Sequence, residues 1–142
     1  MTARTKLGYS IALHPIQMIL LASMLPLFAG GLLSDLAYSS SYEIQWSNFA
    51  AWLIAGAMVF AGISLLWAVV DLVRSETSAR RSVLFPSLLG LMFVLGLINS
   101  FVHARDAWAV MPQGLILSIV VTVLAVGATW ASLKTSSIGG RA

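Results

Sequence analysis

The sequence predicts an all-α fold, namely an integral membrane four-helix bundle with antiparallel up-down connectivity and short loops. Hydrophobic residues make up 59% of the 142-residue chain and charged residues only 9%, whereas soluble domains carry about 25% charged residues. Four apolar segments each approach or exceed the about 20 residues that a membrane helix needs. Short polar links separate them, so consecutive helices are expected to be antiparallel neighbours in one transmembrane domain covering residues 1–142.

The four spans are expected at residues 14–38, 49–73, 83–103 and 112–133. The first two each contain one formal charge near their far end, Asp35 and Asp71, and the last two contain no Asp, Glu, Lys or Arg. Because the segments are apolar on nearly every face, they lack the alternation of polar and apolar residues that a membrane β-strand shows. Pro26 is expected to kink the first span.

A signal peptide is the competing interpretation of the N-terminal region, since two basic residues precede an apolar run that ends in LAYSS. The run is longer than a signal core of about 7–15 residues, and Gln17 interrupts its start. Cleavage would also remove the charge asymmetry described next. The first span is therefore expected to remain in the protein.

Lysine and arginine positions predict the orientation. With four spans, seven of the eight basic residues fall on one side and only Arg105 on the other. The positive-inside rule then places both termini in the cytoplasm of a bacterial inner membrane. Because the basic residues are scattered between apolar runs, the net charge of +3 does not indicate a nucleic-acid-binding surface.

Small residues at helical spacing predict the contacts between helices, because they let helix backbones approach closely in lipid. One such helix-packing seam lies on the fourth span and consists of Ser118, Thr122, Ala125, Thr129 and Ser132. The second span repeats the pattern with Ala57, Ala61, Ser64 and Ala68. A polar conduction path along these hydroxyls is the alternative interpretation.

Ionisable residues near the span ends form two candidate polar clusters, because such groups are costly in a membrane. On the cytoplasmic side the cluster contains His14, Gln17, Asp71 and Arg74. Its alternative interpretation is an interfacial ion pair with a histidine at the headgroup layer.

The second candidate cluster lies on the periplasmic side and contains Asp35, Asn99, His103, Arg105 and Asp106. It is either a polar pocket for a ligand or a proton, or a capped turn between the third and fourth spans. Asn99 and His103 share one helical face, which is the feature that favours a pocket.

Catalytic and metal-binding motifs are missing from the sequence, including HExxH, GxSxG and the phosphate-binding GxxxxGK. The chain has no cysteine, which excludes disulfides and thiolate ligands. No metal site is predicted, and no cofactor is expected. A haem b held by a single histidine, or by ligands from two subunits, is kept as an alternative. One haem cannot join His14 and His103 of one chain, because their levels differ by roughly 30 Å.

The segments LHPIQMILL, AVVDLVRSE and FVHARDAWAVMPQGLILS resemble a bacterial family of small four-span membrane proteins catalogued as domain of unknown function 2231. The resemblance covers nearly the whole chain, and the last segment is its most specific part. It implies a four-span fold in the inner membrane and no established activity. Members of that family carry a second histidine shortly after the His-Pro pair, where this chain has Gln17 and Met18.

These observations predict a small polytopic membrane protein that is a non-enzymatic accessory or interaction protein. Its expected partners are the lipid bilayer, further copies of itself or a larger membrane complex, and not nucleic acid. The alternatives are a haem-binding or redox membrane subunit and a small transporter or channel.

Overall fold

The computed structural model describes residues 14–74 and 84–138, and all regular structure in these two ranges is helical. It comprises α1 (Pro15–Ser41), α2 (Ile44–Arg74), α3 (Leu84–His103), the short 3-10 helix η1 (Ala107–Ala109) and α4 (Gln113–Ile138). The four α-helices are long and apolar enough to cross a membrane. The predicted four-helix membrane bundle is confirmed, and the chain is a multi-pass membrane protein.

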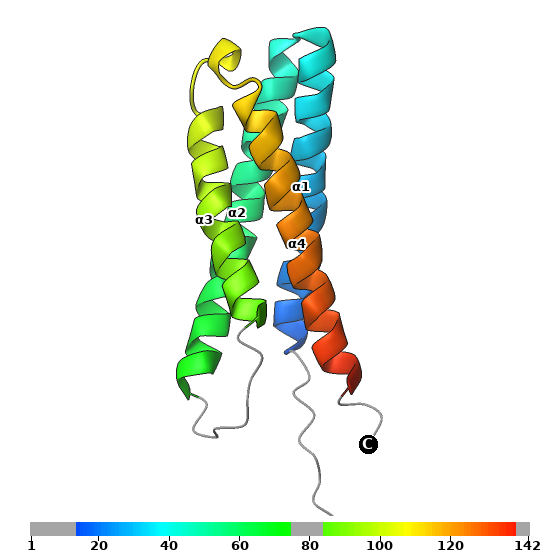
Figure 1. The fold of residues 1–142 in the computed structure, drawn as a ribbon, viewed down its shortest axis with the longest axis vertical. Coiled ribbons are helices and arrows are strands. Elements are labelled where there is room, and N and C mark those ends of the chain that lie inside the picture. Colours follow the sequence, from blue (N-terminus) through cyan, green and yellow to red (C-terminus); the bar gives the residue numbers. More distant parts are fainter. Residues whose placement is uncertain (1–13, 75–83, 139–142) are drawn as a thin grey trace, which may run out of the picture.

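The four α-helices run side by side (Figure 1), and each packs against the helices next to it in the chain, with α4 packing against α1. Helix α1 packs against α2 and α4, and α3 packs against the same two helices. The chain runs up and down, so α1 and α2 form one hairpin and α3 and α4 form a second. We call the end with the α1–α2 link and η1 the hairpin end, and the opposite end, where α1 begins, the terminal end (Figure 1).

Helices α1 and α2 extend further than hydropathy predicts, and the expected link SSSYEIQWS shrinks to Tyr42 and Glu43. The serine side chains at the end of α1 are hydrogen-bonded within the helix, because their hydroxyls donate to backbone carbonyls of the preceding turn, as Ser41 does to Ala37 at 2.7 Å. Tyr42 then ends α1 in the left-handed conformation, with φ 55° and its N–H bonded to the Tyr38 carbonyl.

The other helix boundaries lie close to the predicted ones. Helix α4 continues to Ile138, five residues beyond the expected end at Leu133. Val83, the expected first residue of the third span, lies outside the described residues, and α3 begins at Leu84. Pro26 lies inside α1 as expected.

The middle of the bundle is apolar and closely packed. Met24, Phe28, Ile54, Met92 and Val121 are each 2% exposed or less. By contrast, large apolar side chains cover the outside of the bundle, which is the arrangement expected where lipid is the solvent.

Small residues bring α2 against its neighbours. Ala57 and Ala61 are completely buried. A Cβ added to Gly31 of α1 would lie 3.0 Å from Ile54 Cγ1 of α2, which is tighter than ordinary side-chain contact. The predicted small-residue face of the second span therefore points into the bundle, where it shortens the distance between helices.

Candidate functional site

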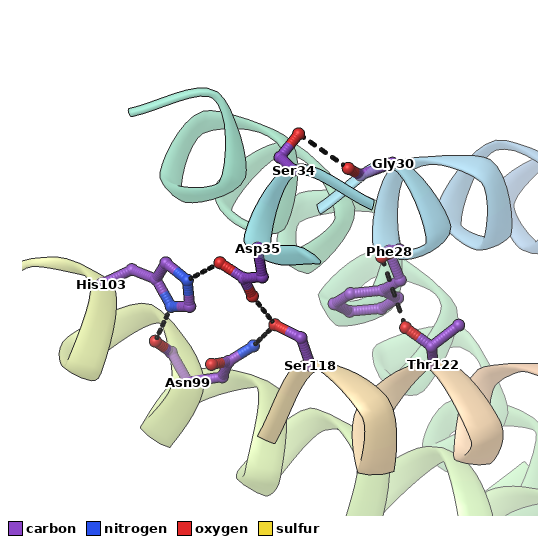
Figure 2. Close-up of polar contacts among 8 residues, drawn as sticks. All are labelled: Phe28, Gly30, Ser34, Asp35, Asn99, His103, Ser118 and Thr122. Atoms are coloured by element: carbon purple, nitrogen blue, oxygen red, sulfur yellow. Dashed lines mark hydrogen bonds and ion pairs between the residues drawn. The ribbon is translucent and has the colours of Figure 1, made fainter. Parts of the chain in front are cut away.

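A buried polar network lies near the hairpin end, inside an otherwise apolar bundle (Figure 2). Asp35 of α1 lies at its centre and is completely buried. Asn99 and His103 come from α3, and Ser118 comes from α4. Each of these three side chains is 6% exposed or less.

Two side chains converge on the Asp35 carboxylate. His103 Nε2 lies 2.8 Å from Asp35 Oδ1, which makes an ion pair when the imidazole is protonated. The Ser118 hydroxyl donates to Asp35 Oδ2 at 2.5 Å. Since these partners come from the diagonal helix α3 and the adjacent helix α4, one carboxylate joins three helices (Figure 2).

Asn99 contacts both Ser118 and His103. Its side-chain amide donates to Ser118 Oγ at 3.0 Å, and its backbone carbonyl lies 3.0 Å from His103 Nδ1. The second contact follows from the sequence, because residues four apart lie on the same helical face. Both ring nitrogens of His103 are therefore engaged, so the ring orientation is fixed.

Gly114 makes room for the His103 ring. A Cβ added at this first-turn position of α4 would lie 2.9 Å from His103 Cε1 and 2.5 Å from Val110 Cγ1. Real Cβ atoms essentially never come so close to other heavy atoms. Glycine at position 114 is thus what lets the imidazole lie between α4 and the carboxylate of Asp35.

Three buried side-chain atoms in the described part of the chain have no hydrogen-bond partner, namely Asn99 Oδ1, Ser64 Oγ and Ser100 Oγ. Asn99 Oδ1 belongs to the network itself. An unpaired buried acceptor is unusual in folded proteins, and it marks Asn99 as a residue with unused hydrogen-bonding capacity.

The structure brings together Asp35, Asn99 and His103 of the periplasmic cluster and separates Arg105 and Asp106 from them. The latter two are exposed in the turn that follows α3. Asp106 precedes η1 without a side-chain capping bond. In the same turn, Trp108 stacks on Tyr42 of the α1–α2 link at a centroid distance of 6.2 Å.

The expected cytoplasmic cluster is described only in part. Exposed His14 caps α1, with its Nδ1 accepting from the Ile16 N–H at 3.3 Å, and its ring lies 5.0 Å from that of Trp67. Gln17 is buried and Asp71 exposed. The side chain of Arg74 lies outside the described residues. The described contact of the His14 ring is with Trp67, one helical turn before Asp71.

The predicted helix-packing seam on α4 faces inward along its length. Ser118, Ala125 and Ser132 are 2% exposed or less, and Thr122 donates to the Phe28 carbonyl of α1 at 3.3 Å. Thr129 instead donates within its own helix, to the Ala125 carbonyl.

Ser118 was predicted as a packing residue, and its bond to Asp35 was missed. A signal was present in the sequence. Ser118 lies six residues inside the expected fourth span, while Asn99 lies four residues before the end of the expected third. In antiparallel helices those positions have similar depth.

The geometry differs from that of the common histidine-dependent sites. In a serine–histidine–carboxylate triad the histidine lies in the middle, whereas here Asp35 lies between Ser118 and His103. An axial haem ligand needs a free ring nitrogen, and both nitrogens of His103 are hydrogen-bonded. His103 in this conformation therefore does not fit a haem. The described residues also contain no group of three His, Cys, Asp or Glu side chains arranged to hold a metal ion.

Comparison of the chain with protein-family models, curated proteins and solved structures gives no match. The resemblance to domain of unknown function 2231 thus stays a prediction, and the site has to be interpreted from its own geometry.

Proposed function

We propose that this protein is a non-enzymatic accessory protein that acts by associating with other proteins within the bilayer. The observation that carries this proposal is the distribution of polarity. The titratable side chains inside the bundle, Asp35 and His103, bond to each other. Apolar side chains cover the outside of the described helices.

The small surface of the two described links, both at the hairpin end, supports the same proposal. Two residues connect α1 to α2, and residues 104–112 connect α3 to α4. Such links offer a soluble partner little area, since specific protein interfaces bury about 800 Å² on each side. The helix surfaces within the bilayer are much larger, so a partner protein is expected to bind to them.

Both alternatives from the sequence find less support. A haem bound through His103 is disfavoured because both ring nitrogens of this histidine are hydrogen-bonded. A transporter needs a continuous polar path, whereas Met24, Phe28, Met92 and Val121 form an apolar layer below the network. An accessory role requires neither a free histidine nitrogen for haem nor a continuous polar path through the bundle.

We further propose the bacterial inner membrane as the location, with cytoplasmic termini and membership of domain of unknown function 2231. The charge asymmetry supports the orientation, because Arg105 is the single basic residue expected on the hairpin side. The three quoted segments support the family.

One helix surface is suited to a test of association. Val123, Gly127 and Trp130 share a face of α4, and the first and last are 65% and 59% exposed. A Cβ added to Gly127 would meet no atom within 4 Å. We therefore expect Gly127→Ile to fold as a monomer while its larger side chain blocks close approach of another helix.

The experiment is crosslinking and copurification of tagged protein from native membranes. We expect a defined complex, containing a second copy or another membrane protein, that Gly127→Ile reduces at least tenfold. The control is Val94→Ile at an exposed position of α3, which should leave the complex unchanged. A monodisperse monomer from native membranes, with no copurifying protein, would contradict the proposal.

A further inference from the structure

Asp35 is where the two helix hairpins are held together at the hairpin end. Three described side-chain hydrogen bonds connect the α1–α2 hairpin with the α3–α4 hairpin, and two of them end on the Asp35 carboxylate. The third, from Thr122 to the Phe28 carbonyl, is long at 3.3 Å. The polar attachment between the hairpins therefore depends on the state of one carboxylate.

Both hydrogen-bond partners of the His103 ring are acceptors, which favours a ring that carries two protons. His103 Nδ1 faces a backbone carbonyl, which only accepts, so this nitrogen carries a hydrogen. His103 Nε2 lies 2.8 Å from Asp35 Oδ1, a distance that requires a hydrogen between them. The pair thus holds one proton more than a neutral imidazole beside a carboxylate.

From these contacts we infer that Asp35 and His103 form a proton-binding site that holds the two hairpins together at the hairpin end. Loss of one ring proton leaves one ring nitrogen without a hydrogen, facing either the Asn99 carbonyl or the Asp35 carboxylate. In either tautomer one hydrogen bond of the network is lost and the buried carboxylate loses its cationic partner, so the attachment between the hairpins weakens at this end. The inference goes beyond the proposed accessory function and does not depend on it.

No other described charge can replace the proton. On α1 the nearby titratable group is buried Tyr38, whose phenol offers no positive charge, and the α1–α2 link adds exposed Tyr42 and Glu43. Arg105 and Asp106 are exposed in the turn after α3. The charged residues of α2 are Asp71 and Arg74 at the terminal end, and α4 has none before Lys134. His103 is therefore the cationic partner of Asp35.

The absence of cysteine from the sequence makes a distance measurement direct. Spin labels at Glu43→Cys and Ala109→Cys, both exposed, report the hairpin end. Labels at Ile19→Cys and Leu133→Cys, exposed near the terminal end, are the matched pair. Distances between labels are measured in nanodiscs from about pH 5 to about pH 10, which brackets the ordinary titration of histidine. His14→Gln leaves His103 as the single histidine, so its ¹⁵N signals report the proton.

We expect a second, longer distance at the hairpin end once the His103 ring loses its proton, and none at the terminal end. Asp35→Asn should stay closed throughout, because its amide donates to neutral Nε2 and its oxygen accepts from Ser118. Should that variant not fold, Ser118→Ala retains the pair and must show the wild-type transition. Unchanged wild-type distances across the range, or a transition that survives Asp35→Asn, would overturn the inference.

Discussion

The partners of Asp35 stabilise the bundle mainly because they compensate the cost of burying its carboxylate. A hydrogen bond between membrane helices contributes about 0.6 kcal/mol on average and about 1.7 kcal/mol at most. An uncompensated buried charge costs several kcal/mol. The bonds from His103 and Ser118 are therefore more important for removing that penalty than for any net attraction.

Gly114→Ala tests how closely His103 must be placed. The new Cβ would overlap Val110 and the imidazole, so the ring must move away from Asp35. We expect a loss of about 1–3 kcal/mol in the free energy of unfolding, the usual cost of overpacking, measured by reversible unfolding in mixed micelles. The His103 Nε2 hydrogen-bond signal in NMR should weaken with it.

Gly127→Ala is the matched control, because the same change there meets open space. It should be neutral or add about 0.5–1 kcal/mol, since alanine favours a helix over glycine. Equal effects of the two substitutions would show that His103 does not depend on the space at Gly114.

At the scale of the helices, packing is decided by which face carries small residues. Ala57, Ala61, Ser64 and Ala68 of α2 are all buried, while Val59 and Leu66 of the same helix face outward. The sequence predicted this buried face correctly from steps of four, three and four residues, because positions three or four apart lie on one side of a helix.

Ala61→Leu should separate α2 from its neighbours, because position 61 is completely buried. We expect destabilisation of at least about 1–3 kcal/mol, read from the same micelle unfolding experiment. Val59→Leu adds a methylene group on the exposed face and should change stability by less than about 0.5 kcal/mol. A tolerated leucine at position 61 would contradict the close α2 packing.

The limits of hydropathy are visible at the ends of α1 and α2. Polar residues from Ser39 to Ser47 looked like a link, yet most of them are helical. The hydroxyls of Ser39, Ser40 and Ser41 donate to backbone carbonyls of the preceding turn, so these polar side chains are satisfied within the helix itself. Hydropathy measures preference for lipid, and a helix can continue beyond the bilayer when its backbone is satisfied.

For the whole molecule, the proposed orientation predicts which surfaces react from outside the cell membrane. Single variants Glu43→Cys and Ala109→Cys should react with a membrane-impermeant thiol reagent in intact spheroplasts, since both positions are exposed at the hairpin end. A reporter that works only in the cytoplasm should be active when it is fused after Ala142, and a reporter that works only in the periplasm should be inactive there. If labelling requires permeabilised membranes, the hairpin end is cytoplasmic and the proposed orientation is wrong.

Sequence alone was sufficient for the number of helices, their order and the buried faces of the second and fourth. Membrane insertion is a local property, because each segment of about 20 residues interacts with lipid independently of the others. The same reasoning selected Asp35, Asn99 and His103 as costly groups inside a membrane. It also grouped Arg105 and Asp106 with them, because closeness along the chain was the only guide to closeness in space.

The network itself becomes visible only in the folded bundle. Its bonds to Asp35 join residues 68 and 83 positions apart, and no local pattern specifies which side chain meets which. In the sequence, Ser118 is one of five small residues of its seam, and only the packing of α4 against α1 brings it to Asp35. Packing of α3 and α4 around one carboxylate decides that this serine, and not Arg105, becomes the second partner of Asp35.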